Sequence, residues 1–108
     1  MLYKLCFYVP VESAERVKAA IFATGAGKIG NYDSCCWQVE GMGQFRPLAG
    51  ANPAVGEMAC VNLLPELKIE MVIAPELVRS AVAALLAAHP YEEPAYQLWP
   101  VMTLDDLP

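Results

Sequence analysis

One histidine stands in a short polar segment near the end of the chain, beside residue types that bind divalent cations. Residues 89–94 read His-Pro-Tyr-Glu-Glu-Pro, and His89 is the single histidine of the 108-residue sequence. Imidazole binds divalent ions and titrates near neutral pH, and carboxylates supply hard oxygen ligands. Glu92 and Glu93 are adjacent, so on extended backbone they point to opposite faces and do not readily chelate one ion together. The segment therefore predicts a two-ligand metal site, His89 and Glu92, that other subunits would have to complete.

His89 also has a structural interpretation, because it ends an apolar helical pattern. Pro90 disfavours helical backbone at the residue before it, so the helix stops at His89. The free carbonyls and the dipole at a helix C-terminus favour an imidazole there. Both interpretations of His89 stay open. No nucleophile is tied to the histidine by sequence spacing, so the sequence predicts no catalytic residue.

A second candidate site is the stretch 41–57, GMGQFRPLAGANPAVGE, which follows no regular apolar period. Connections this long are uncommon in small domains and are usually functional or mobile. Backbone N–H groups around Gly41 and Gly43 are suited to an anion, and Arg46 is the only positive charge of the stretch. The alternative is a packed Ω-loop with an apolar core of its own. The predicted ligand-binding residues are Gly41, Gly43, Phe45 and Arg46.

The cysteines show no zinc or disulfide pattern. Cys35 and Cys36 are neighbours, so on a strand their thiols point apart. Cys6 and Cys60 lie far from them, and no pair has the two-residue spacing of a structural zinc site. A domain with a full apolar core does not need disulfides. We expect reduced thiols and a cytoplasmic location.

Six regular elements account for most apolar residues outside the loop. Strand-like runs occur at 2–9, 29–40, 58–73 and 95–101. Apolar residues recur at helical spacing in 11–24 and 75–89, and proline or glycine bounds each helix. Pro65, inside the third strand run, predicts a bulge or an edge position, because proline cannot donate to a ladder.

The order of these elements, β-α-β-β-α-β, predicts an α+β fold. It is the order of the ferredoxin-like, split β-α-β-β-α-β sandwich, in which two helices cover one face of a four-stranded antiparallel sheet. We expect one domain over residues 1–108, with a short peripheral tail at 102–108.

Composition narrows the class of function. Hydrophobic residues make up 56% of the chain and charged residues 18%, which excludes a disordered tail or a coiled coil. A small chain this apolar is expected to oligomerise. The net charge of −5, without a run of basic residues, argues against a nucleic-acid partner. No stretch of about 18 apolar residues occurs, so no membrane span is expected.

Residues 89–92 together with Pro94 resemble the His-Pro-Tyr-Glu signature of the CutA family, the divalent-cation-tolerance proteins. That family has the same order of elements and carries its signature between the second helix and the last strand, as here. Glu93 departs from the signature, because CutA proteins typically have an apolar residue there. The resemblance implies that a divalent metal ion is the cofactor to consider.

A broader resemblance covers nearly the whole chain. Its blocks are 27–32, 41–47, Pro53, Gly56, 69–70 and 89–96. In this order they are similar to the YqfO-type inserted domain of the Nif3-like proteins, which is itself similar to CutA and to the PII signalling proteins. The dinuclear-metal hydrolase-like halves of Nif3-like proteins have no counterpart in this sequence, so we do not expect their activity here.

The resemblance also implies an assembly and a role. PII and CutA proteins are trimers whose sheets pack around a central axis, which implies a homotrimer here, with a dimer as the alternative. In PII proteins the connection between the second and third strands is the regulatory loop, which corresponds to 41–57. We therefore expect a free-standing, non-enzymatic regulatory module that binds a small molecule or a protein partner. Two alternatives stay open: a divalent-metal-binding protein using His89 and Glu92, and an enzyme with a pocket at the subunit interface.

Overall fold

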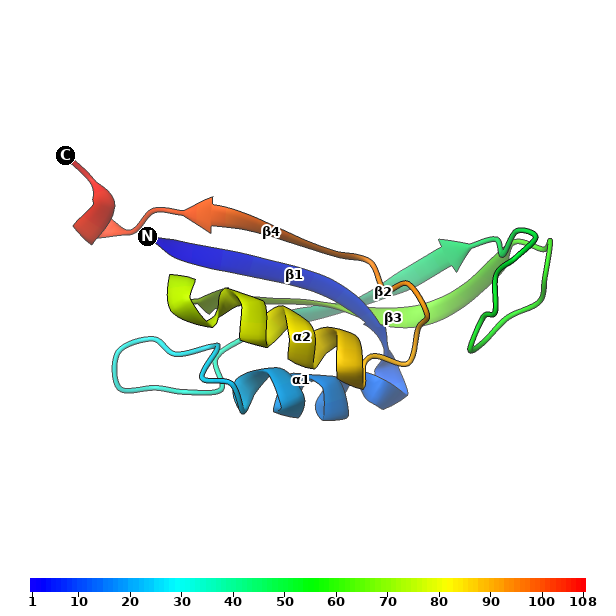
Figure 1. The fold of residues 1–108 in the computed structure, drawn as a ribbon, viewed down its shortest axis with the longest axis horizontal. Coiled ribbons are helices and arrows are strands. Elements are labelled where there is room, and N and C mark those ends of the chain that lie inside the picture. The colour runs from blue at the N-terminus through cyan, green and yellow to red at the C-terminus, as the bar shows by residue number, and fades with distance from the viewer.

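Two helices cover one face of a four-stranded antiparallel sheet (Figure 1) in the computed structural model, which describes residues 1–108. The strands are β1 (Leu2–Pro10), β2 (Trp37–Phe45), β3 (Asn62–Ile73) and β4 (Tyr96–Val101), in the spatial order β2-β3-β1-β4. The helices are α1 (Ala14–Phe22) and α2 (Val78–Ala88), each preceded by one 3-10 turn. This arrangement confirms the predicted α+β, ferredoxin-like fold.

The core lies between the helices and the middle of the sheet. Successive strand side chains point to opposite faces, so alternate residues of β1 face the helices. Leu5, Phe7 and Val9 are fully buried on that face, and Val17 and Ile21 of α1 are fully buried against it. Burial of each such side chain stabilises the fold by about 1.5–3 kcal/mol. Neither helix is long and apolar enough to cross a membrane.

The other face of the sheet carries large apolar side chains that nothing in the chain covers. The strand register places Trp37 and Val39 of β2 and Trp99 of β4 on this face, with Lys4 and Glu70 between them. Trp37 is 60% exposed, Val39 45% and Trp99 39%. Lys4 and Glu70 form an ion pair at 3.8 Å. We call this surface the open sheet face.

The second strand begins and ends later than the sequence analysis predicted. Residues 29–36 are a connection with one isolated bridge, Ile29 to Tyr32, and Ser34 has a positive φ of 55°. The strand starts at Trp37 and continues through 41–45, residues for which the sequence predicts a loop. The connection between β2 and β3 is therefore 46–61 rather than 41–57. The side chains of β2 are largely exposed, so burial did not mark where this strand begins and ends.

Beyond the end of β1, β2 and β3 continue as a two-stranded arm (Figure 1) that lengthens the molecule to 50 Å. Pairing of β3 with β1 ends at Pro10 and Glu66, whereas pairing with β2 continues to Phe45 and Asn62. Pro65 lies in this arm, where β3 has a neighbour on one side only. The edge position that its missing donor predicted is the one observed.

Candidate ligand pocket

His89 fastens the end of α2 to the first strand. It is the residue that follows α2, and it is only 6% exposed. Its Nε2–H donates to the carbonyl of Tyr8 at 2.7 Å, and its Nδ1 accepts the backbone N–H of Tyr91 at 3.0 Å. A carbonyl only accepts and an N–H only donates, so the ring is neutral with its proton on Nε2. Burial lowers the pKa of His89, and this effect exceeds the upward effects of the hydrogen bond to Tyr8 and of the negative charge of Glu66.

The pair His89 and Glu92 does not fit a divalent cation in this arrangement. Both ring nitrogens of His89 are engaged by backbone groups. The Glu92 carboxylate is exposed and accepts the N–H of Asn52 at 3.2 Å. No group of three or more potential metal-binding side chains is present. Metal binding by these two residues therefore stays a prediction, and it would require His89 to give up one of its hydrogen bonds.

The helix-end interpretation of His89 needs a correction in detail. Its side chain does not bind the last carbonyls of α2 but reaches β1 and the following segment. The carbonyl of Ala88 is instead bound by Arg16 of α1, whose Nη2 donates at 3.2 Å. The histidine thus joins a helix to a strand, and the arginine joins the two helices.

Tyr91 extends from the same segment to the arm. Its hydroxyl donates to Glu66 Oε2 at 2.6 Å, and its ring lies 6.2 Å, centroid to centroid, from that of Phe45. The Glu66 carboxylate lies over Gly43, where a Cβ atom would overlap it. Burial raises the pKa of Tyr91, and the hydrogen bond and negative charge of Glu66 raise it further.

The connection 46–61 is held in shape by the first residue of β3. Asn62 Oδ1 accepts the N–H of Glu57 at 3.0 Å, and Asn62 Nδ2 donates to the carbonyls of Glu57 and Cys60 at 3.0 and 2.8 Å. The N–H of Ala59 donates to the carbonyl of Pro47 at 2.9 Å. These bonds give the loop a defined path across the end of the arm.

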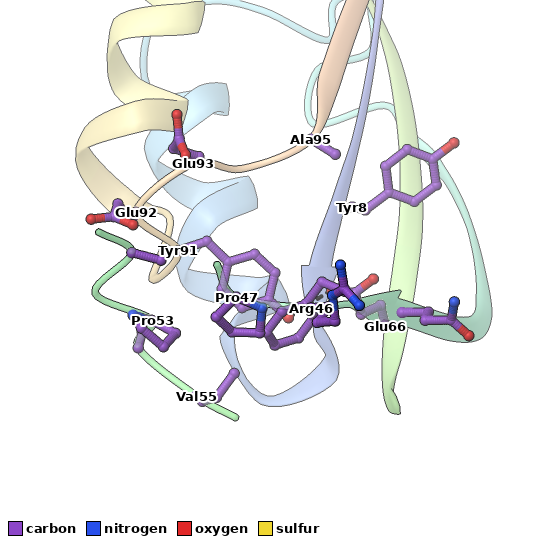
Figure 2. Close-up of a pocket in the computed structure, with 14 residues that line it drawn as sticks. Tyr8, Arg46, Pro47, Pro53, Val55, Glu66, Tyr91, Glu92, Glu93 and Ala95 are labelled. Carbon is purple, nitrogen blue, oxygen red and sulfur yellow. Dashed lines mark hydrogen bonds between the residues drawn. The ribbon is translucent and has the colours of Figure 1, made fainter. Parts of the chain in front are cut away.

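A pocket of about 250 Å³ lies between this loop, the arm and the segment after α2 (Figure 2). In Figure 2 the Tyr91 ring points toward Pro47 and Arg46, and the Tyr8 ring lies apart from them. The remaining lining residues are Gln44, Phe45, Ala51, Pro53, Ala54, Val55, Glu66, Glu92, Glu93 and Ala95. Aromatic and proline side chains form walls, and Arg46 and the glutamates add charge, so the pocket suits a small ligand with both apolar and polar parts.

The structure brings together candidates that the sequence analysis kept in separate sites. Phe45, Arg46 and Glu92 all line the pocket. Gly41 and Gly43 do not line it, because they lie in β2 and pair with β3 rather than forming an exposed loop. The anion-binding role expected for their N–H groups assumed that both glycines lie in an exposed loop.

Two important residues of the site were not predicted. Tyr91 belongs to the quoted motif, but only the structure shows its hydroxyl bound to Glu66, 25 residues away. Glu66 had no distinguishing signal, because it follows the pattern of a strand. The pairing of Gly41 with Glu66 across the arm places this carboxylate beside Gly43.

Comparison with known structures identifies the fold of the chain. The fold matches that of the periplasmic divalent cation tolerance protein CutA from Archaeoglobus fulgidus with a TM-score of 0.68, over 95% of this chain and 86% of that one. The two sequences are 14% identical, so the match shows the fold alone. The chain has a CutA-like fold.

Closer similarity is found to segments of longer proteins. The Bacillus cereus protein related to NIF3 matches with a TM-score of 0.78 and 36% identity, over 94% of this chain and 26% of that one. The GTP cyclohydrolase 1 type 2 homolog of Mycobacterium leprae is 48% identical over 99 residues, which are 91% of this chain and 26% of that protein. No protein-family model matches the chain. The chain is therefore similar to one segment of Nif3-related proteins, and it spans about a quarter of the length of the curated relatives it matches.

Proposed function

We propose that this domain is a non-enzymatic regulatory module of PII/CutA type, which binds a small ligand or a partner side chain in the pocket between residues 46–61 and 91–95. The observation that carries the proposal is the pocket itself, which joins the long loop and the residues after α2 in one cavity. An apolar pocket with a few convergent polar groups is the default place to expect a ligand.

The lining indicates how such a ligand would be held. The rings of Phe45 and Tyr91 offer apolar faces for a flat group. Arg46 lines the same cavity and presents a planar fork of donors. The names of the relatives refer to GTP cyclohydrolase homologs, which are far longer proteins. For this reason GTP is included as a probe, and their activity is not carried over.

The test is a titration followed by NMR of the backbone amides, with GTP, ATP, Mg²⁺ and Cu²⁺ as separate probes. We expect the shifts caused by a bound probe to centre on residues 45–47 and 91–93. Arg46→Ala should weaken that binding about tenfold or more, as loss of a charge-assisted hydrogen bond does. Arg79→Ala, on exposed helix surface outside the pocket, is the matched control. Shifts centred elsewhere, or equal effects of both variants, would contradict the proposal.

The proposal includes the assembly and the compartment. The open sheet face, with its exposed tryptophans, supports the homotrimer that the PII and CutA resemblance implies. All four cysteines are free thiols, which is the expected state in a reducing compartment such as the cytoplasm.

A further inference from the structure

Glu66 and Tyr91 form one wall of the pocket, and Gly43 lies behind that wall, against the Glu66 carboxylate. The Tyr91 hydroxyl donates to Glu66 Oε2 at 2.6 Å. A Cβ atom at Gly43 would overlap Oε1 and the carboxyl carbon of Glu66. The carboxylate therefore lies in a notch that exists only because position 43 has no side chain.

The segment that carries Tyr91 depends on such contacts for its position. Residues 89–95, between α2 and β4, belong to no helix or strand. The backbone of Tyr91 is bound to His89 within the same segment, whereas its hydroxyl is bound to Glu66 of β3. The hydroxyl bond therefore ties the segment to the arm, and the ring of Tyr91 stays beside Phe45.

We infer that Gly43 and Glu66 are positioning residues that hold Tyr91 in place as a wall of the pocket. This inference builds on the proposed function, because the position of that wall sets the size of ligand that the pocket admits. It assigns Gly43 a role different from anion binding: the residue makes room for a carboxylate of its own chain.

The strand provides a matched control for a direct test. Gly41 lies in β2 two residues before Gly43, on the same sheet face, and a Cβ atom there would meet nothing within 4 Å. Gly41→Ala and Gly43→Ala therefore make the same chemical change on the same strand. We expect only Gly43→Ala to displace the Glu66 carboxylate and release Tyr91.

The readout is the hydrogen bond and the ring position of Tyr91 at neutral pH, followed by NMR in protein labelled with ¹³C at tyrosine Cζ and assigned with Tyr91→Phe. The Cζ chemical shift depends on whether the hydroxyl donates to Glu66, and an NOE between the Phe45 and Tyr91 rings requires that the two rings lie side by side. In Gly43→Ala the Cζ signal of Tyr91 should move away from its wild-type shift, and the NOE between the rings should disappear. In Gly41→Ala both signals should match the wild type.

An unchanged Tyr91 Cζ shift and ring NOE in Gly43→Ala would overturn the inference, and so would equal changes in Gly41→Ala. If Gly43→Ala does not fold, Glu66→Ala tests the same link, because it removes the acceptor of the Tyr91 hydroxyl. There too, an unchanged Cζ shift and ring NOE of Tyr91 would overturn the inference. None of these signals needs a ligand, so a failure of every probe to bind would reject the proposed function and leave this inference standing.

Discussion

The buried imidazole of His89 makes two hydrogen bonds, one to the carbonyl of Tyr8 and one to the N–H of Tyr91. His89→Ala removes the donor to the Tyr8 carbonyl and the acceptor for the Tyr91 N–H. A buried donor or acceptor left without a partner costs about 1–3 kcal/mol. For the two groups together we expect the unfolding free energy to fall by about 2–3 kcal/mol. Urea unfolding at fixed protein concentration measures this loss. Unchanged stability, with loss of Cu²⁺ binding instead, would favour the metal-ligand interpretation.

The same residue predicts how stability changes with pH. Burial lowers the pKa of His89 in the folded protein below its unfolded value of ~6.5. As pH falls through ~6.5, the unfolded chain takes up a proton that the folded chain does not, so the unfolding free energy decreases. The decrease continues until pH reaches the lowered pKa of the folded state. Urea unfolding at pH 7.5, 6.5 and 5.5 should show this trend in the wild type and a weaker one in His89→Ala. Equal trends in both proteins would contradict the assignment.

At the scale of the elements, two glycines of the connection 46–61 allow the cost of backbone strain to be measured apart from the cost of a steric overlap. Gly50 and Gly56 both have positive φ, 95° and 90°. A Cβ atom at Gly50 would meet nothing within 4 Å, whereas one at Gly56 would lie 2.9 Å from Asn62 Cγ and from Phe45 Cζ. Gly50→Ala should cost only the strain of a left-handed residue, about 1 kcal/mol.

Gly56→Ala should add the displacement of Asn62 to the same strain, because Asn62 holds the loop through three hydrogen bonds. We therefore expect faster hydrogen exchange at the N–H of Ala59 in Gly56→Ala than in Gly50→Ala. Equal exchange in the two variants would show that Asn62 does not determine the path of the loop.

The complete connection can also be removed, because Phe45 and Asn62 are the last paired residues of the arm. Replacing residues 46–61 by Asn-Gly joins this pair by a two-residue hairpin turn. Closing the shorter loop saves about 2 kcal/mol of entropy, from ~0.6 per halving of length. We expect the melting temperature to be kept and binding of the GTP or ATP probe to be lost. Unfolding of the variant would show that the loop is structural.

At the scale of the whole molecule, the open sheet face predicts the assembly. Light scattering at micromolar concentration should give three times the 11.7 kDa mass of the chain. Trp37→Lys places a charge on the open sheet face and should dissociate the trimer. Leu86→Lys changes an apolar residue of α2 that is 46% exposed and should leave the trimer intact. A monomeric wild type, or dissociation by Leu86→Lys alone, would contradict this assembly.

The sequence alone determined those parts of the fold that bury one face of an element. β1 was visible as a continuous apolar run. The later half of β3 and both helices were visible as periods, because exclusion of water from one side of an element imposes alternation or helical spacing. Their order predicted the α+β fold. The sequence also singled out the segment 89–94 as unusual, and Tyr91 and Glu92 of this segment line the pocket.

Only the tertiary structure determined the limits of β2 and the identity of the pocket. The strand-like run predicted at 29–40 overlaps only the first part of β2, and the continuation of the strand to Phe45 was missed because its two glycines are typical of a loop. The contact between Tyr91 and Glu66 joins residues 25 apart through the register of the arm. The spacing of apolar residues within one segment shows which side of that segment is buried. The contact between two polar groups far apart in the sequence depends instead on how the strands pair, and no single segment determines this.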